Sequence, residues 1–527
     1  MTTIKLDGNT LSSTEISLVA NGAKVEVAID AWGKVELARD VVNRILNTGE
    51  IVYGINTGFG ALVSESISTD ELNALQNNLI RSHACGIGER MSLEDTRAMM
   101  CVRINSLVKG HSGIQKKVVQ QIVDYLNADI IPVVPRLGSL GASGDLAPLS
   151  HMALALIGEG EVWHNGVATP TSEVLREKGM IGVELGAKDG LSLINGTSQM
   201  CSLLVRADNV LANLIPMADL IACVSLEAKE CSIQPMDPRV HKVRPHHGQS
   251  LVAERISYIM KNSQILEHHL DCDKVQDAYS FRCIPQVHGA VLERYRNLSD
   301  TLDIEINSAT DNPLIFPEPS NPGSHEVISQ GNFHGEILAL TADNMSHALF
   351  ELGHISERRI DQIVDPSRSD LPAFLAKNSG LESGMMIVHY VAAAALSELH
   401  AGANPRSAFS TPTSGGQEDH VSMGATACWN LLKSCEQFAH ILACELLIAC
   451  EALEYRNAEP SYHVKTLYNL VRKISPPLTV DRSTSKEIEQ ISHNLVDGGW
   501  LARIEAECGR LPRCCLLYTS DAADDSA

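Results

Sequence analysis

Residues 425–457 read ATACWNLLKSCEQFAHILACELLIACEALEYRN and contain neither glycine nor proline. At about 1.5 Å per residue, such a run predicts a helix roughly 50 Å long. Its apolar side chains, which include Leu431, Phe438, Leu442 and Leu446, occupy more than one side of the helix. Such a helix needs neighbours around most of its circumference, which favours a helical bundle completed by other subunits. A helix buried within a monomer is the alternative.

The first part of the chain differs from the rest. Up to residue 197, short helical patterns alternate with glycine and proline breaks, such as those in residues 54–60 and 131–135. Breaks of this kind mark turns and loops, so we expect an N-terminal globular, loop-rich domain at residues 1–197.

Long helical patterns follow from residue 198. One helix face is predicted from apolar residues that recur at spacings of four and three, namely Leu338, Ala342, Met345, Leu349 and Leu352. Pro366 should lie beyond the end of that helix. We therefore expect a mainly α fold, with a long-helix bundle at residues 198–510 that other subunits complete. Residues 511–527 form a small, acidic, patternless tail, which we interpret as disordered or as non-native sequence from a vector or adapter.

Composition argues against several classes of function. Asp and Glu total 64 against 42 Lys and Arg, and the formal charge of -22 would repel a phosphate backbone, so no nucleic-acid partner is expected. The apolar residues 200–224 are interrupted by Arg206, Asp208, Pro216 and Asp219, which predicts a buried helix and not a membrane span. The first residues lack the basic and apolar regions of a secretory signal. We expect a cytoplasmic protein without membrane contact.

The cysteines and histidines predict neither a disulfide framework nor a metal centre. Fourteen cysteines are scattered through the chain without a CxxC pair at zinc-like spacing, which is typical of reduced thiols. The histidines are dispersed or doubled, and HExxH is absent. No catalytic metal is expected.

Residues 138–148, GSLGASGDLAP, are the most informative segment. Glycines and small neighbours permit backbone turns closed to bulkier residues, and by themselves they fit a tight turn before a helix. A phosphate-cradling loop is a second interpretation, but no GK[ST] follows. A third interpretation is that the backbone of this segment reacts with itself, because the unhindered nitrogen of Gly144 can attack the carbonyl carbon of Ala142. Loss of water from the ring and from Ser143 then leaves an exocyclic methylene, a strong electrophile.

The segment resembles the signature of the histidine and aromatic amino acid ammonia-lyase family. The resemblance extends from about residue 10 to about residue 505. It includes five further motifs, in this order: YGINTGFG at 53–60, INGTS at 194–198, QDAYSFR at 276–282, DNPL at 311–314 and GNFH at 331–334. It implies a mainly helical homotetramer in which each active site draws loops from three subunits. It also implies a small amino acid substrate and a 4-methylidene-imidazol-5-one formed autocatalytically from Ala142, Ser143 and Gly144, without an external cofactor.

The resemblance assigns roles to further residues. It places Tyr53 as the base that removes the β-proton, which requires a lowered pKa because an ordinary tyrosine titrates at about 10. Arg282 would bind the substrate carboxylate through its planar guanidinium. Four polar or aromatic residues would surround the substrate and the prosthetic ring, with Tyr279 among the catalytic groups: Asn195, Gln276, Tyr279 and Phe333. From the residues alone, Tyr53 also fits a packed aromatic and Arg282 a structural ion pair.

Two segments favour histidine as the substrate. RSHACG at 81–86 and QEDHVSM at 417–423 resemble the histidine enzymes, in which His83 and Glu418 would contact the substrate. Phenylalanine-type relatives carry apolar residues near position 83, and phenylalanine- and tyrosine-directed relatives have Gln where Glu418 stands. A carboxylate can accept the imidazole N–H, whereas a phenyl ring offers no donor. Alternatively, Glu418 stabilises the N-terminus of a helix that begins near Val421.

Other positions differ from the histidine enzymes. Cys283 agrees with them, but Ala278 stands where they usually have proline and tyrosine aminomutases have alanine, and Gly335 and His389 also differ. We expect a carbon–nitrogen lyase that converts L-histidine to trans-urocanate by non-oxidative elimination of ammonia. Two alternatives stay open. One is a tyrosine or phenylalanine ammonia-lyase or tyrosine 2,3-aminomutase with the same electrophile, and the other is a catalytically silent structural homo-oligomer.

Overall fold

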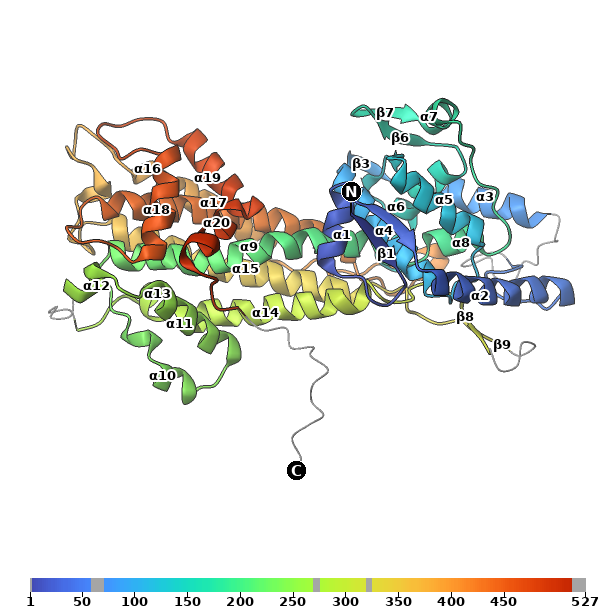
Figure 1. Ribbon diagram of the computed structural model, residues 1–527, viewed down its shortest axis with the longest axis horizontal. Helices are drawn as coiled ribbons and strands as arrows, with labels where there is room; N and C mark the ends of the chain where they lie inside the picture. The colour runs from blue at the N-terminus through green and yellow to red at the C-terminus, as the bar shows by residue number, and fades with distance from the viewer. Residues whose placement is uncertain (1, 58–70, 269–274, 319–324, 514–527) are drawn as a thin grey trace. The chain divides into compact units, whose positions relative to one another are not determined.

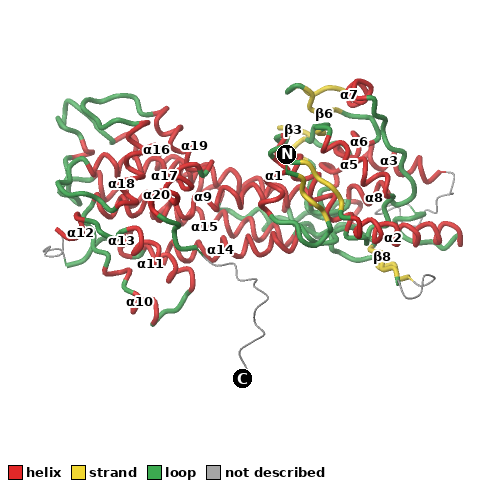
Figure 2. The backbone as a smooth tube through the Cα atoms, viewed as in Figure 1, coloured by secondary structure: helices red, strands yellow, loops and turns green. Residues whose placement is uncertain are grey.

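The computed structural model describes residues 2–57, 71–268, 275–318 and 325–513. In this part of the chain, helices α1 to α20 account for most residues and strands β1 to β9 are short (Figure 1, Figure 2). The predicted mainly α fold is confirmed. The chain forms two compact units, each discontinuous in sequence. The first comprises Met1–Asn209, Arg296–Ser346 and Asn404–Lys433, and the second comprises Val210–Tyr295, His347–Ala403 and Ser434–Ala527.

The first unit contains all nine strands of the described residues. Its helices are α1 (Ser13–Ala20), α2 (Ile29–Thr48), α3 (Leu72–His83), α4 (Leu93–Val108), α5 (Lys116–Asn127), α6 (Leu146–Leu156), α7 (Thr171–Lys178) and α8 (Asp189–Ile194), with a 3₁₀ turn at Ser414–Gly416. The strands β1 (Thr3–Leu6) and β2 (Lys24–Val27) pair in parallel. The other sheets are antiparallel: β3 (Ile87–Arg90) with β5 (Pro135–Leu137); β4 (Ile131–Pro132), β6 (Glu161–His164) and β7 (Val167–Pro170); and β8 (Leu314–Pro317) with β9 (His325–Ile328).

Helix α4 is almost entirely buried in the first unit. Ser92 caps its first turn, because the hydroxyl oxygen of Ser92 accepts the backbone N–H of Asp95 at 3.0 Å. Every residue from Asp95 to Val108 is buried, and α1 and α5 pack against this helix. The first unit is therefore built around a helix with no solvent-facing side.

The second unit consists of helices and contains no β-strand among its described residues, apart from an isolated bridge between Ser379 and Glu382. It contains α10 (Pro238–Lys242), α11 (His247–Ile259), α12 (Gln264–His268), α13 (Tyr279–Arg282), α16 (Met386–Gly402), α18 (Tyr462–Ile474), α19 (Ser485–Asp497) and α20 (Gly499–Cys508), with 3₁₀ turns at Gln234–Met236 and Ala373–Leu375. Four of the five sequence boundaries between the units fall inside long helices, namely α9 (Ser198–Ala228), α14 (Ile284–Glu305), α15 (Glu336–Val364) and α17 (Gly424–Leu453), and the fifth, between residues 403 and 404, directly follows α16.

The helices predicted from the sequence are confirmed. α17 covers nearly all of residues 425–457, and Phe438, Leu442 and Leu446 are fully buried. α15 contains the apolar face predicted at residues 338–352 and ends at Val364, before Pro366. α9 is long and apolar enough to cross a membrane, but 78% of its most apolar window is buried inside the described structure. The prediction of a buried helix at residues 200–224 therefore holds.

Buried charges join several helices within the second unit. Oε1 of Glu445 on α17 accepts a hydrogen bond from Nε of Arg359 on α15, with 2.6 Å between the two atoms. Asp219 on α9 bonds to Nδ1 of His288 on α14 at 2.6 Å and forms an ion pair with Arg255 on α11. Burial alone would raise the pKa of Asp219, but the positive charge of Arg255 and the bond to His288 outweigh it and lower the pKa. These partners hold the helices together, because removing Arg359 or Glu445 would leave the other charge buried without its counter-ion.

The described chain packs as far as Arg513. Leu511 is buried, and the carbonyl oxygen of Pro512 accepts Nε of Arg255 at 2.9 Å. Residues 514–527 lie outside the described residues, so the disordered or foreign tail stays a prediction. The predicted domain boundary at residues 197 and 198 falls at the start of α9, and that division also stays a prediction.

Candidate active site

The segment 138–145 lies in the first unit between β5 and α6. Gly141 and Gly144 have φ angles of 66° and 72°, in the left-handed region that favours glycine. A Cβ atom at Gly144 would collide with the carbonyl group of Gly196, and one at Gly141 would collide with the hydroxyl of Ser422. Both positions require glycine because the backbone is packed against two segments that are distant in sequence.

Asp145 fastens this loop to the N-terminus of α9. Its buried carboxylate accepts the hydroxyl of Ser139 at 2.8 Å and the backbone N–H groups of Gln199 at 2.8 Å and Met200 at 3.0 Å. The N–H of Asp145 donates to the carbonyl oxygen of Gly196 at 2.7 Å. Burial raises the pKa of the Asp145 carboxyl to about 6, and the hydrogen bonds limit the rise. The chain that follows the Ala-Ser-Gly triplet is therefore firmly held.

Ser143 is held at two atoms. Its Oγ donates to Oε1 of Glu418 at 2.6 Å, and its carbonyl oxygen accepts Nδ2 of Asn195 at 2.8 Å. The other carboxylate oxygen of Glu418 accepts the hydroxyl of Thr413 at 2.7 Å, and the backbones of Thr413 and Glu418 form an antiparallel bridge. α17 begins at Gly424 and not near residue 421, which removes the basis for the helix-capping interpretation of Glu418. The carboxylate is thus aimed at the serine hydroxyl.

Asn195 is positioned by buried charges around α8. It follows the last residue of that helix and is 3% exposed. Lys188, at the start of α8, is fully buried and its Nζ lies 2.7 Å from Oδ2 of Asp311, which also accepts the hydroxyl of Ser192 at 3.0 Å. Burial lowers the pKa of Lys188, and the charge of Asp311 opposes this effect. The ion pair anchors α8 and so fixes the amide that bonds to Ser143.

Ser143 lines a pocket of about 230 Å³ in the first unit, together with His83, Thr413 and Glu418. Nδ1 of His83 lies 2.8 Å from the carbonyl oxygen of Leu79. Because a carbonyl oxygen only accepts, this contact assigns the proton to Nδ1 and leaves Nε2 as an acceptor in the neutral ring. The pocket is therefore lined by a carboxylate and by an imidazole whose Nε2 can accept a hydrogen bond.

Tyr53 and Phe333 also belong to the first unit. Tyr53 is half-buried in a turn after α2, and residues 58–60 of its motif lie outside the described residues. Phe333 is half-buried in the turn before α15, where the N–H of Gly335 donates to the carbonyl oxygen of Gly141 at 3.0 Å. Among the described residues, the pocket lining includes neither aromatic side chain.

Gln276, Tyr279 and Arg282 belong to the second unit, on α13 and the segment before it. The guanidinium carbon of Arg282 lies 4.6 Å from the centroid of the Tyr279 ring, a cation–π contact. Tyr279 is 72% exposed, which is unusual for so large an aromatic side chain. The structure thus brings His83, Asn195 and Glu418 together around Ser143 and places Tyr279 against Arg282, whereas Tyr53 and Phe333 line neither group.

Three residues that hold the site were not predicted from the sequence: Asp145, Thr413 and Lys188. Asp145 directly follows the Ala-Ser-Gly triplet, and its position there could have drawn notice. Thr413 and Lys188 carry no local signal, because their partners Glu418 and Asp311 become evident only when the chain is folded.

The chain belongs to the aromatic amino acid lyase family, since the family's sequence profile, described as Aromatic amino acid lyase, matches residues 11–473. The histidine ammonia-lyase of Myxococcus xanthus (strain DK1622) is 44% identical over 500 residues, which cover 94% of this chain and 97% of that protein. The crystal structure of histidine ammonia-lyase from Trypanosoma cruzi superposes with a TM-score of 0.88 at 39% identity, covering 96% of this chain and 95% of the other. Tyrosine aminomutase from Streptomyces globisporus superposes with a TM-score of 0.89 at 34% identity, covering 96% and 99%. The resemblance found in the sequence is confirmed.

Proposed function

We propose that this protein eliminates ammonia from L-histidine and releases trans-urocanate. The observation that carries the proposal is the carboxylate of Glu418, held by Thr413 and aimed at Ser143 in the pocket that His83 also lines. Similarity to the histidine ammonia-lyases of Myxococcus xanthus and Trypanosoma cruzi over most of both chains supports it.

The backbone of residues 142–144 fits conversion into a methylidene-imidazolone. Ring closure joins the Gly144 nitrogen to the carbonyl carbon of Ala142, whose oxygen leaves as water. The lack of a side chain at Gly144, enforced by the packing against Gly196, leaves this nitrogen unhindered. Asn195 donates to the carbonyl oxygen of Ser143, which draws electrons from that carbonyl and makes the adjacent Cα proton easier to remove. Loss of this proton together with the Ser143 hydroxyl accounts for the second water. Once formed, the group supplies an electrophilic methylene for the substrate amine, so that nitrogen departs readily.

Glu418 loses its hydrogen-bond partner Ser143 when the methylidene-imidazolone forms, a process called maturation below. Before dehydration, its Oε1 accepts the hydroxyl of Ser143, and departure of that hydroxyl removes the donor. Thr413 still holds the other carboxylate oxygen, so Oε1 becomes an oriented, open acceptor. A histidine imidazolium carries two N–H donors, which match Oε1 of Glu418 and Nε2 of His83. A phenyl ring has no N–H or O–H donor, so it would leave both acceptors without a partner.

The remaining roles follow those of the family. We assign proton abstraction to Tyr53 and binding of the substrate carboxylate to Arg282, with Gln276, Tyr279 and Phe333 around the substrate and ring. The high exposure of Tyr279 is consistent with a site completed by neighbouring subunits. We therefore propose a cytoplasmic homotetramer that acts on a small amino acid, needs no external cofactor and binds neither nucleic acid nor membrane.

A tyrosine-directed lyase or 2,3-aminomutase is the second candidate. It is favoured by Ala278 and by the similarity to tyrosine aminomutase from Streptomyces globisporus. The carboxylate at Glu418 argues against it, because an unsubstituted phenol has a single donor and no positive charge for that carboxylate.

One experiment separates the candidates. Purified protein is incubated with L-histidine, L-tyrosine or L-phenylalanine, and the products are resolved by chromatography, with Ser143→Ala as the matched control. Urocanate from histidine supports the proposal, whereas coumarate or β-tyrosine as the main product transfers it to the second candidate. No product from any of them, together with an intact mass that retains both waters, would identify a catalytically silent oligomer. Sedimentation during the assay should find the activity in the tetramer, and an active monomer would refute the shared site.

A further inference from the structure

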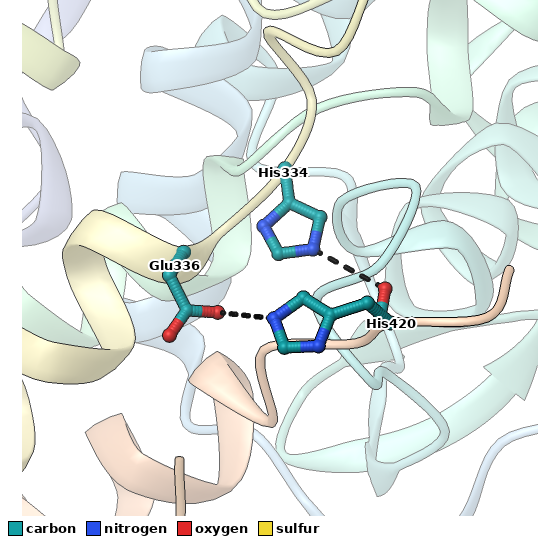
Figure 3. Close-up of side chains that lie close together, drawn as sticks. All are labelled: His334, Glu336 and His420. Carbon is teal, nitrogen blue, oxygen red and sulfur yellow. Dashed lines mark hydrogen bonds and ion pairs between the residues drawn. The ribbon is translucent and has the colours of Figure 1, made fainter. Parts of the chain in front are cut away.

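Three potential metal ligands converge in the first unit but do not line the described pocket at Ser143. They are His334, Glu336 and His420, and their ligand atoms all lie within 4.8 Å of one another (Figure 3). His334 and Glu336 are half-buried on the turn before α15 and on its first residue, and His420 is exposed on the segment before α17. Because 86 positions separate His334 from His420, no spacing in the sequence predicts this cluster.

Direct hydrogen bonds do not account for this arrangement. Nε2 of His420 lies 3.6 Å from Oε2 of Glu336, which is longer than a good hydrogen bond. Within the described residues, this Oε2 atom is buried and has no hydrogen-bond partner. Nε2 of His334 lies 3.4 Å from the carbonyl oxygen of His420, a marginal contact. A buried carboxylate oxygen without a donor is costly, and it points to a partner of another kind.

The distances suit a small divalent cation. With ligands at about 2.1 Å in a tetrahedron, two ligand atoms lie about 3.4 Å apart. The pair formed by His420 and Glu336 is already near that separation, and the other pairs need to close by about 1.4 Å or less, since no pair exceeds 4.8 Å. The His420 ring is exposed and stacks on the His334 ring with their centroids 5.7 Å apart, so this adjustment requires the two rings to turn out of the stack. Two imidazoles and one carboxylate are ligands that Zn²⁺ accepts, with water in the fourth position.

The two segments that carry these ligands also hold the loop at residues 138–145. From the first segment, the N–H of Gly335 donates to the carbonyl oxygen of Gly141 at 3.0 Å. From the second, the hydroxyl of Ser422 donates to the same oxygen at 3.0 Å, and the N–H of Met423 donates to the carbonyl oxygen of Leu140 at 2.8 Å. A cation between the segments would therefore tie together both supports of the loop.

We propose that His334, Glu336 and His420 bind one Zn²⁺ ion, which braces the two segments that support the Ala-Ser-Gly loop. The site takes no part in bond making or breaking. The proposal does not depend on the identity of the substrate.

Binding is measured on the full-length protein after removal of metals with a chelator, without any substrate. Zn²⁺ uptake is followed by equilibrium dialysis with elemental analysis for the parent, His420→Ala, Glu336→Gln and the control His493→Ala. The control removes another exposed histidine that lies 4.0 Å from a carboxylate, on α19. We expect one Zn²⁺ per chain in the parent and the control, and roughly tenfold or more weaker binding in the other two variants, because each loses a ligand.

Two further measurements locate the bound ion on the chain. Zn²⁺ should raise the melting temperature of the parent and of His493→Ala but not that of His420→Ala, since a ligand that binds only the native state stabilises it. Co²⁺ should give the visible d–d bands of a tetrahedral site without a thiolate charge-transfer band, which distinguishes this site from binding by a cysteine. Equal Zn²⁺ affinity in the parent, His420→Ala and Glu336→Gln, or a thiolate band that persists in His420→Ala, would overturn the proposal.

Discussion

Replacing Glu418 with glutamine tests the basis of the proposed choice of substrate. The amide is nearly the same size, and its NH₂ group can donate to the hydroxyl oxygen of Thr413 where a carboxylate oxygen now accepts. The amide oxygen would then face Ser143 as Oε1 does now. Position and acceptor are kept, so the change removes only the negative charge.

The magnitude follows from that difference. Hydrogen bonds to charged groups contribute about 1.5–3 kcal/mol and neutral ones about 0.5–1.5 kcal/mol, so the loss should be about 1–2 kcal/mol. At about 1.36 kcal/mol for each factor of ten, kcat/KM for L-histidine should fall about 5- to 30-fold. Activity with L-tyrosine or L-phenylalanine should fall less, or rise.

The assay compares kcat/KM for the three amino acids in Glu418→Gln and in Glu161→Gln, which neutralises an exposed carboxylate 3.7 Å from Arg90. Intact mass should report loss of two waters in both variants. In Glu418→Gln an amide oxygen still accepts the hydroxyl of Ser143, and in Glu161→Gln the carboxylate of Glu418 is unchanged. With maturation thus verified, the kinetics report on the substrate alone. A histidine-to-tyrosine selectivity equal to that of the parent would refute the assigned role of Glu418.

Three other changes test the chemistry and the packing. Ser143→Ala should keep the melting temperature of the parent, but it has no hydroxyl to lose as the second water, so its intact mass should not show the loss of two waters and it should release almost no ammonia. Parental turnover would exclude the methylidene mechanism. Glu445→Gln leaves the buried charge of Arg359 without its counter-ion, so it should lower the free energy of unfolding by about 3–5 kcal/mol, and an unchanged urea midpoint would show that the pair does not stabilise the helices. Burial raises the pKa of Glu227 from its ordinary value of 4.5 to about 7, so its contribution to stability is complete below the unfolded pKa and is lost as the pH rises through about 7. The melting temperature should therefore fall between about pH 5 and about pH 8, and Glu227→Gln should reduce that fall, whereas an identical slope would contradict the raised pKa.

The sequence predicts those features that depend on neighbouring residues. The Gly- and Pro-free run at 425–457 and the apolar spacing at 338–352 predict α17 and α15, because helix formation and one-sided burial are local properties. The triplet at 142–144 is equally visible, since its chemistry needs three consecutive residues. The bond from Thr413 to Glu418 and the meeting of His334 with His420 are not predictable in this way, because they depend on how distant segments pack.

The close packing of Gly144 against Gly196 has a consequence for the order in which the chain folds and its proposed prosthetic group forms. These residues are far apart in sequence, and they meet only after the segments that contain them have folded. If ring closure requires that contact, an unfolded chain stays chemically inert and keeps the mass of its translated sequence. A chain that folds and forms the proposed ring would become lighter by two waters and would remain so after later unfolding. The mass of each molecule would then be a permanent record that it had once reached its native state.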